Sequence, residues 1–491
     1  MYSLGIDVGT SSVKVSLLDI RTGNCVDSST NPKSEAPIIA LRKGWAEQDP
    51  ESWWDYTCEG IREIASRHPV RDIASIGITY QMHGLVCIDR NGRPVRNSII
   101  WCDSRAAGIG ARALEEIGYE KCMSHLLNSP GNFTASKLAW VKRNEPEAYE
   151  RVWKIMLPGD WIAYKLSGEL STTGTGLSEG IMWDFKENSV AGFVLEHYGI
   201  EPDKLPGIVP SIGVQVRTCQ EAFELLGIKK GTPICYRAGD QPNNAFSLNV
   251  LNPGEVAATG GTSGVVYGVT DIPKADPASR VNTFLHVNDT DDAHRYGVLL
   301  CISGTGIMNA WMRRNVCPQL NYQDMNRVAA TAAPGSDGLT LLPFGNGIER
   351  MLGNKATGAE FIGLDLVRHN TATMLRATQE GIAFSFLYGM EIMKNLGLDL
   401  SVIRAGKANM FLNPIFCTTL STVSGASIEL FNTDGALGAA RGAALGAGFY
   451  NNEREAFETL CKEAVIGPEE NSREALLEAY GKWKNELESR I

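Results

Sequence analysis

One carboxylate, Asp240, stands where an apolar segment ends, a position from which an acid can take part in chemistry. The preceding residues PICYRAG predict a strand, and Gln241, Pro242 and the two asparagines after them predict a turn. A carboxylate placed there could accept the proton of an attacking hydroxyl during phosphoryl transfer to an alcohol. An Asp-Gln-Pro turn is also ordinary turn chemistry, so this residue alone does not decide between the two interpretations.

Two Gly-Thr-Ser turns, roughly 250 residues apart, each join two apolar segments that predict a strand hairpin. Such turns offer successive backbone N–H groups and hydroxyls to a phosphate without bulky side chains in the way. The alternative is two plain β-turns. Their repetition favours two halves built on one plan, with phosphate-binding candidates at Gly9, Thr10, Ser11 and Ser12 and at Gly260, Gly261 and Thr262.

Asp7 ends the first predicted strand, directly before the first of these turns. There it could hold a hydrated Mg²⁺ beside nucleotide phosphates; the alternative is an exposed aspartate. The chain contains no GxxxxGK[ST] P-loop, and no GxGxxG follows a predicted strand. Any nucleotide site must therefore be built in another way.

Three further patterns have both a functional and a structural interpretation. Gln81, Met82 and His83 end a predicted strand and could contact sugar hydroxyls, although a single histidine beside an apolar strand is usually a core residue. The segment 101–105, WCDSR, places an acid and a base after a strand, and an internal salt bridge is the alternative. Residues 404–414 form a strand–turn–helix pattern in which Gly406 and Ala408 would let a flat ring approach the backbone, or else a tight turn.

The composition limits the class of protein. The 491 residues carry a formal net charge of -10, so the electrostatic signature of a nucleic-acid-binding protein is absent. The eleven cysteines are dispersed without a CxxC pair, which favours reduced thiols over a zinc site or a disulfide framework. No segment resembles a signal peptide or a membrane span. We therefore expect a cytoplasmic protein with no nucleic-acid or membrane partner; the sequence leaves a homodimer open.

Strands and helices alternate along the chain, which predicts the α/β class with two domains, residues 1–248 and 249–491. Helical spacing follows Asp49 and recurs over 134–148, 159–168 and 370–395, and a small-residue helix is expected from about 434. We expect a helix to begin near Asp103 or Ser104. The segment 172–180, TTGTGLSEG, predicts an irregular loop.

Together these motifs resemble the FGGY family of carbohydrate kinases, and within it the xylulokinases. The resemblance runs from GIDVGTSSVKVSLLD at the start to DGALGAARGAALGAG near the end. FTASKLAWVKRN (133–144) and GAEFIGLDLVRHNTATMLRATQEG (358–381) resemble the two signatures of the family. QMHG (81–84) with WCDSR (101–105) is the feature similar to xylulokinases.

The resemblance implies a two-lobed, actin-like ATPase (ribonuclease H-like) fold with a central cleft in which ATP, Mg²⁺ and a sugar meet. It implies that Asp240 is the general base toward O5 of D-xylulose, giving D-xylulose 5-phosphate. It also implies three groups of binding residues: Gln81, Met82, His83 and Gln241 at the sugar; Asp7 at the metal, with both Gly-Thr-Ser turns at the phosphates; and Gly406, Lys407 and Asn409 at the adenosine.

Three positions depart from the family pattern. Gln241 stands where xylulokinases usually have Asn, Thr373 stands where the second signature often has a more polar residue, and 172–180 replaces an acidic motif. These departures bear on the sugar, because none touches the phosphate-binding turns or Asp240. The alternatives are a kinase of another ketose, a polyol or gluconate, a nucleotide-gated actin-like interaction protein, and a sugar-binding pseudokinase.

Overall fold

The computed structural model describes residues 1–491, which form two compact units. The first unit comprises Met1–Asn249, Phe284–Tyr296 and Thr433–Leu460; the second comprises Val250–Thr283, Gly297–Asn432 and Cys461–Ile491. The chain therefore passes between the two units several times, and the boundary predicted after residue 248 coincides only with the first passage. Two later segments return to the first unit, and one of them contains the small-residue helix.

The first unit is built on a six-stranded mixed sheet. Its central strands β14, β5 and β1 run parallel, whereas β13, β2 and β3 are antiparallel to their neighbours. The hairpin predicted around the first Gly-Thr-Ser turn is confirmed as β1 and β2. In spatial order the strands are β13 (Ile212–Arg217), β14 (Pro233–Gly239), β5 (Ile73–Tyr80), β1 (Tyr2–Val8), β2 (Val13–Asp19) and β3 (Cys25–Asn31).

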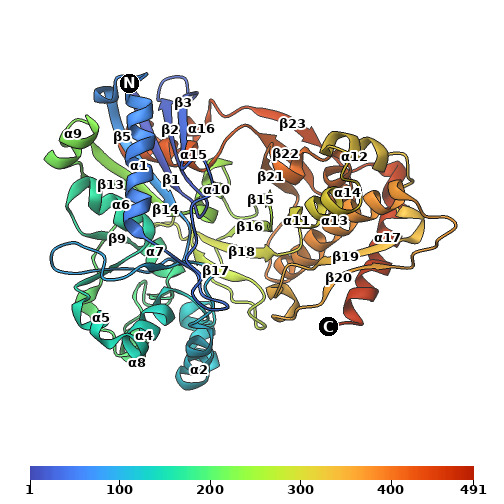
Figure 1. Ribbon diagram of the computed structural model, residues 1–491, viewed down its shortest axis with the longest axis horizontal. Helices are drawn as coiled ribbons and strands as arrows, with labels where there is room; N and C mark the ends of the chain where they lie inside the picture. Colours follow the sequence, from blue (N-terminus) through green and yellow to red (C-terminus); the bar gives the residue numbers. More distant parts are fainter. The chain divides into compact units, whose positions relative to one another are not determined.

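Helices cover this sheet on both faces (Figure 1). The helices of the unit are α1 (Pro50–Ala65), α2 (Ala107–Ile117), α3 (Tyr119–Lys121), α4 (Thr134–Asn144), α5 (Pro146–Arg151), α6 (Pro158–Ser167), α7 (Gly174–Glu179), α8 (Gly192–Tyr198), α9 (Gln220–Leu226), α10 (Asp240–Ser247), α15 (Gly435–Gly446) and α16 (Glu453–Phe457). Short strand pairs join β4 (Glu47–Gln48) with β7 (Ser98–Ile99), β6 (Val86–Ile88) with β8 (Lys154–Met156), β9 (Ser171–Thr173) with β12 (Gly207–Val209), and β10 (Trp183–Asp184) with β11 (Ser189–Val190).

The two faces of β1 differ because side chains alternate along a strand. Leu4, Ile6 and Val8 belong to a buried cluster with Trp53 of α1 and Trp161 of α6. Fully burying a large apolar side chain contributes roughly 1.5–3 kcal/mol, so this face forms the main core of the unit. The opposite face carries small and polar residues, of which Asp7 is the last.

Helix α15 packs unusually close to this second face because the contact residues lack side chains. A Cβ atom added at Gly5 would lie 1.7 Å from the carbonyl oxygen of Ala436, and one at Gly77 would lie 1.9 Å from that of Ala439. The Ser3 hydroxyl donates to the carbonyl of Ala440 at 2.6 Å. The helix therefore rests on the backbone of the two central strands.

The second unit repeats the plan with a seven-stranded sheet. The hairpin of β15 and β16 carries the second Gly-Thr-Ser turn, and β21 and β22 continue parallel to β15. In spatial order the strands are β17 (Asn282–Leu285), β18 (Tyr296–Ile302), β16 (Gly264–Thr270), β15 (Val256–Gly260), β21 (Val402–Gly406), β22 (Ser427–Phe431) and β23 (Lys462–Ile466). Its helices are α11 (Gly306–Asn315), α12 (Tyr322–Ala329), α13 (Thr371–Asn395), α14 (Pro414–Ser424) and α17 (Glu470–Glu488), and β19 (Thr340–Phe344) pairs with β20 (Gly358–Ile362).

Four sequence-based expectations about local structure were wrong. The predicted turn at Asp240 is the start of α10, because Pro242 lies in the first helical turn, where its missing N–H is tolerated. The predicted loop 172–180 forms β9 and α7, with the Thr173 side chain capping the helix. The helix expected near Asp103 begins at Ala107. The helix expected over 134–148 ends at Asn144, and Pro146 starts α5.

All eleven cysteines are free thiols. The longest helix, α13, does not combine the length and hydropathy that a bilayer span requires, and neither does any other helix.

The contact between α15 and the sheet predicts a strong effect of one added methyl group. Gly77→Ala should lower the free energy of unfolding of the first unit by about 1–3 kcal/mol or more, because the new Cβ overlaps the backbone of the helix. Urea unfolding followed by tryptophan fluorescence measures this. Gly108→Ala on α2 is the matched control, since nothing lies within 4 Å of its added Cβ. Unchanged stability of Gly77→Ala would show that the helix does not rest on the strand backbone.

Candidate active site

Asp240 is the first residue of α10, immediately after β14 in the centre of the sheet. Its side chain is partly accessible, but protein encloses most of it. Burial raises the pKa of this carboxyl to about 6, while hydrogen bonds from Gln241 act in the opposite direction. A carboxylate with a pKa near the working pH of an enzyme is suited to accepting a proton.

The first Gly-Thr-Ser turn closes on itself through a hydrogen bond from the Gly9 N–H to the Ser12 carbonyl at 3.0 Å. Beside it lies a cavity of about 370 Å³. The cavity combines backbone, hydroxyl and charged groups that suit an anionic ligand with a cation. The turn and the ends of its strands line it: Asp7, Gly9, Thr10, Ser11, Ser12, Lys14 and Thr30.

Asp7 lies among like charges that the sequence did not connect. Burial, followed by the charges of Asp240 and Asp434, raises its pKa to about 7; Lys14 lowers it. Asp434 caps the N-terminus of α15 by accepting from the Leu437 N–H at 2.9 Å, and pairs with Lys14 at 2.6 Å. A Cβ at Gly435 would lie 2.3 Å from a carboxylate oxygen of Asp7, so only glycine lets the helix come this close.

The carboxylate cluster fits a hydrated divalent cation rather than a directly ligated one. A positive charge would relieve the repulsion that raises the pKa of Asp7. No three His, Cys, Asp or Glu side chains approach closely enough to hold a metal by themselves. Mg²⁺ keeps most of its water shell when bound beside phosphates, so the residues present match this ion.

Gln81 is engaged within the protein. Its amide accepts from the Thr10 hydroxyl at 3.1 Å and donates to the side chain of Gln48 at 3.0 Å, and the latter donates to the Thr10 carbonyl at 2.7 Å. The Thr10 hydroxyl also accepts from the indole of Trp101 at 2.9 Å. Gln81 is therefore placed to fix the first turn.

Met82 and His83 continue from the end of β5 toward Asp240. Met82 is buried against Gly239, where an added Cβ would lie 2.6 Å from its side chain. His83 has a positive φ of 62°, a strained conformation for a residue with a side chain. Lys137 holds this peptide, because its ammonium group donates to the carbonyls of His83 and Ile100 at 2.7 and 3.0 Å. Burial lowers the pKa of Lys137 to about 7.

Glu179 is the most unexpected neighbour, since it lies in the segment predicted to be a loop. The side chain is 2% exposed, and neither carboxylate oxygen has a hydrogen-bond partner. The Tyr80 hydroxyl approaches the carboxylate, but not in hydrogen-bonding geometry. Burial, and then the charge of Asp240, raises the pKa of Glu179 well above its ordinary value. An isolated buried carboxylate is costly, so burial favours the neutral acid at this position.

The acid and base of WCDSR form the internal salt bridge that was the structural interpretation. Arg105 pairs with Asp103 at 2.7 Å and with Glu47 at 2.6 Å, and all three side chains are buried. The guanidinium also lies 3.8 Å from the centre of the Trp45 ring. These residues consequently support the loop before β4 and take no part in the carboxylate cluster.

In the second unit the Gly-Thr-Ser turn is packed against the start of α11. The N–H groups of Gly306 and Ile307 donate to the carbonyls of Gly261 and Thr262 at 3.0 and 3.1 Å. A Cβ at Gly260 would lie 2.8 Å from the side chain of Met410. The turn is therefore held as bare backbone by neighbouring elements.

The 3₁₀ turn Asn409–Leu412 brings Asn409 beside that loop. Asn409 has a φ of 52°, and its side-chain amide would lie 3.8 Å from a Cβ added at Gly261. Gly406 ends β21, and the Lys407 ammonium pairs with Glu463 at 2.9 Å. The Lys407 N–H donates to the Phe431 carbonyl at 2.9 Å, and its ammonium pairs with a residue of β23.

Sequence reasoning missed four residues of these surroundings: Lys14, Lys137, Glu179 and Asp434. Asp434 carried a usable signal, because an aspartate directly before a helical segment is a common N-cap. The spacing of the other three residues gave no such signal, because their importance comes from contacts between segments that are distant in the sequence.

Comparison with known proteins gives matches along most of the chain. Residues 2–247 match the N-terminal domain of the FGGY family of carbohydrate kinases, and residues 256–449 match its C-terminal domain. The xylulose kinase of Bacillus subtilis strain 168 is 28% identical over 479 residues, which cover 94% of this chain and 92% of that protein. The xylulose kinase of Streptomyces rubiginosus is 32% identical, with 81% of this chain and 78% of that protein covered.

Solved structures of two sugar kinases have the same fold. A ligand-bound xylulose kinase from Lactobacillus acidophilus superimposes with a TM-score of 0.90 at 24% identity, covering 99% of this chain and 98% of that one. A gluconate kinase from the same organism gives the same TM-score, identity and coverage. The two-unit actin-like architecture predicted from the sequence is thereby confirmed.

The burial of Glu179 predicts a pH-dependent stability. The unfolded chain releases this proton at the ordinary pKa of glutamate, whereas the folded chain keeps it to a higher pH. Stability is therefore lost as pH rises between those two values. Glu179→Gln cannot ionise, so its stability relative to the wild type should increase with pH by up to about 1.4 kcal/mol per unit.

Urea unfolding of both proteins between about pH 5 and pH 7 measures this difference. Glu169→Gln, which alters an exposed glutamate, is the control and should show no such trend. A constant difference between Glu179→Gln and the wild type would mean that Glu179 is already ionised in the folded protein.

Proposed function

Because the chain belongs to the FGGY family of carbohydrate kinases, we propose that it transfers the γ-phosphate of ATP to O5 of D-xylulose. The product is D-xylulose 5-phosphate. The similarity to xylulose kinases over more than four fifths of the chain supports this sugar. The cysteines are free thiols, as expected for a protein that functions in the reducing cytoplasm.

The observation that carries the proposal is the environment of Asp240. Burial raises the pKa of its carboxyl to about 6, the residue is partly accessible, and it begins the helix that directly follows β14. Beside it the amide oxygen of Gln241 has no hydrogen-bond partner. One hydroxyl of the sugar could lose its proton to Asp240, and a second hydroxyl could donate to the Gln241 amide oxygen.

Met82 and His83 line the sugar in this proposal. The His83 Nδ1 atom lies 2.9 Å from the Glu179 carbonyl, which can only accept, so the ring proton sits on Nδ1. The rings of Phe133 and Phe284 pack against the histidine at 4.8 and 5.6 Å. These contacts fix the ring, and a fixed ring can distinguish one arrangement of hydroxyls from another. Gln81 acts indirectly by holding the first turn.

Asp7 would hold the hydrated Mg²⁺, and Gly9, Thr10, Ser11 and Ser12 would offer their N–H and hydroxyl groups to the phosphates. When bound, Mg²⁺ neutralises charge on the transferring phosphate. Gly260, Gly261 and Thr262 of the second unit would bind phosphate through bare backbone, as their packing allows. Gly406, Asn409 and the backbone of Lys407 would lie beside the adenosine.

Asp240 accepts the proton of the attacking hydroxyl as the oxygen bonds to phosphorus, and ADP leaves. The base must be ionised beforehand, which it is above about pH 6. Lys14 stabilises the ionised form of Asp7 in the same region. In this proposal the two carboxylates have different roles: Asp240 acts on the sugar, and Asp7 holds the hydrated cation.

A second candidate within the family is gluconate or another ketose. Two observations support this second candidate. A gluconate kinase structure is as similar as the xylulose kinase structure, and Gln241 departs from the residue usual in xylulokinases. The family match sets aside the nucleotide-gated interaction protein, because it identifies a carbohydrate kinase.

A substrate panel decides among these sugars. ADP release with Mg-ATP should be strongly stimulated by D-xylulose and weakly by L-xylulose, D-ribulose, L-ribulose, L-fuculose, D-gluconate and glycerol. A no-sugar reaction gives the baseline. Preference for another member of the panel would replace D-xylulose, and a flat response would contradict the assignment of kinase activity toward these sugars.

Replacing the proposed base separates its role from binding. Asp240→Asn keeps the shape of the side chain but removes the proton acceptor, so kcat should fall by about 10²–10⁴ while ATP affinity stays near the wild-type value. Steady-state kinetics and equilibrium nucleotide binding measure the two quantities. Asp203→Asn, at an exposed position, is the control. Wild-type turnover by Asp240→Asn would exclude Asp240 as the base.

A further inference from the structure

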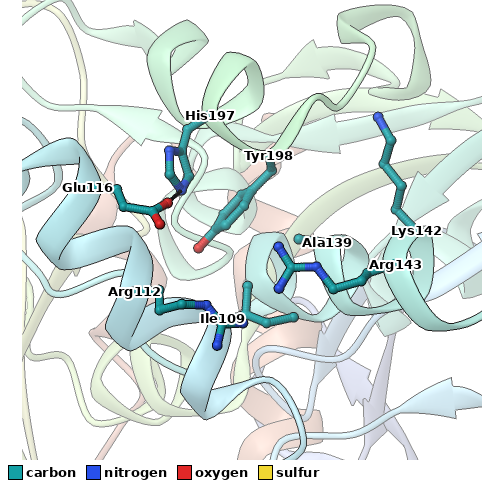
Figure 2. A pocket seen from close by; sticks show the side chains of 8 residues that line it. All are labelled: Ile109, Arg112, Glu116, Ala139, Lys142, Arg143, His197 and Tyr198. Atoms are coloured by element: carbon teal, nitrogen blue, oxygen red, sulfur yellow. Dashed lines mark ion pairs between the residues drawn. The ribbon is translucent and has the colours of Figure 1, made fainter.

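A second cavity, of about 300 Å³, lies on the first unit among three helices. It shares no residue with the cavity beside Asp7. Helices α2, α4 and α8 meet there, although they are far apart in sequence (Figure 2). The residues that line it are Ile109, Arg112, Glu116, Ala139, Lys142, Arg143, His197 and Tyr198.

The charges of this cavity are unbalanced. Three cationic side chains line it against one carboxylate, Glu116, which faces His197 at 3.5 Å. On a chain with a net charge of -10, such an excess of positive charge is a local feature. It marks a site that attracts anions.

The guanidinium groups of Arg112 and Arg143 make no ion pair or hydrogen bond, unlike those of most arginines of the chain. Lys142, in contrast, donates to the Gly199 carbonyl. Figure 2 shows the side chains of both arginines extending toward the middle of the cavity from opposite sides, whereas that of Lys142 points away. Both arginines are exposed, so solvent screens the repulsion between them, and an anion that lay between them could contact both guanidinium groups.

The remaining walls suit the uncharged part of a small molecule. Ile109 and Ala139 supply an apolar floor, and Tyr198 supplies an aromatic face. The Tyr198 hydroxyl bonds to the Ser136 hydroxyl at 2.8 Å, which fixes the ring. Burial raises the pKa of Tyr198 to about 12, so the ring stays uncharged. A rigid ring beside an apolar floor can pack against the carbon skeleton of a sugar.

We propose that this cavity binds a phosphorylated sugar, with Arg112 and Arg143 holding its phosphate. A planar guanidinium matches phosphate oxygens with two parallel hydrogen bonds, and a dianionic phosphate balances two such groups. A carbohydrate kinase produces a molecule of this class, so the ligand can be its own product or a related sugar phosphate. The assignment does not depend on which sugar the enzyme phosphorylates.

Isothermal titration calorimetry tests the site with D-ribose 5-phosphate, inorganic phosphate, D-ribose and acetate as probes. The wild type should bind D-ribose 5-phosphate most tightly, inorganic phosphate less tightly, and the other two not measurably. The double variant Arg112→Gln/Arg143→Gln should weaken D-ribose 5-phosphate binding at least about tenfold. Its kcat and KM without added sugar phosphate should equal those of the wild type, which separates this cavity from product binding at the active site.

Arg71→Gln/Arg90→Gln removes the same charge from two exposed positions elsewhere on the first unit and should leave binding unchanged. If both double variants lost the same affinity for D-ribose 5-phosphate, the effect would come from net charge alone, and the proposal would be overturned. Unaltered binding in Arg112→Gln/Arg143→Gln, or acetate competing as well as phosphate, would overturn it too. Equal affinities for inorganic phosphate and D-ribose 5-phosphate would exclude recognition of the sugar.

Discussion

The close approach of α15 to the central strands is the contact on which the arrangement of the first unit depends. Glycines on both sides of the contact remove the side chains that would separate helix from sheet. The helix comes from residues 435–446, yet it rests on strands formed by residues 2–8 and 73–80. It therefore ties the end of the chain to its beginning and sets the position of Asp434 and Gly435 beside Asp7.

That packing also explains the electrostatics. The small face of β1 leaves no apolar cover over Asp7, so the carboxylate meets the start of α15 on one side and the start of α10 on another. The N-termini of both helices favour negative charge, but burial outweighs this effect and raises the pKa values of Asp7 and Asp240. At Asp7 the charges of Asp240 and Asp434 raise the pKa further. In the proposed function, a bound cation would offset the negative charge around Asp7.

The sequence predicted those parts of the site that are local in the chain. The two hairpins and their turns followed from alternating strands around Gly, Thr and Ser, and Asp240 followed from its place at the end of a strand. The motifs quoted for the family resemblance identified the family that the comparisons show. What could not be predicted depends on tertiary contacts. Lys137 reaches the His83 carbonyl across 54 residues, and no periodicity encodes that hydrogen bond.

Local propensity also misled where tertiary packing decided the outcome. Glycine and threonine in 172–180 suggested a loop, but Thr173 caps a short helix whose glycines fit against buried side chains. An added Cβ at Gly176 would lie 2.6 Å from Leu157. The same segment carries Glu179 to a place behind Gly239, where an added Cβ would lie 2.6 Å from the glutamate oxygen. A stretch that departs from the family pattern is thus part of the wall around the proposed base.

The start of α10 shows how the sugar could change without the chemistry changing. Successive residues of a helix point about 100° apart, so Asp240 and Gln241 face different directions from one fixed backbone. Pro242 and Asn243 are buried and hold that backbone, with the Asn243 amide donating to the Gly435 carbonyl at 2.9 Å. Gln241 can therefore differ between kinases while the proton acceptor stays in place. In the proposed function, specificity would therefore depend on side chains around a base of fixed position. The solved structures with this fold include a xylulose kinase and a gluconate kinase.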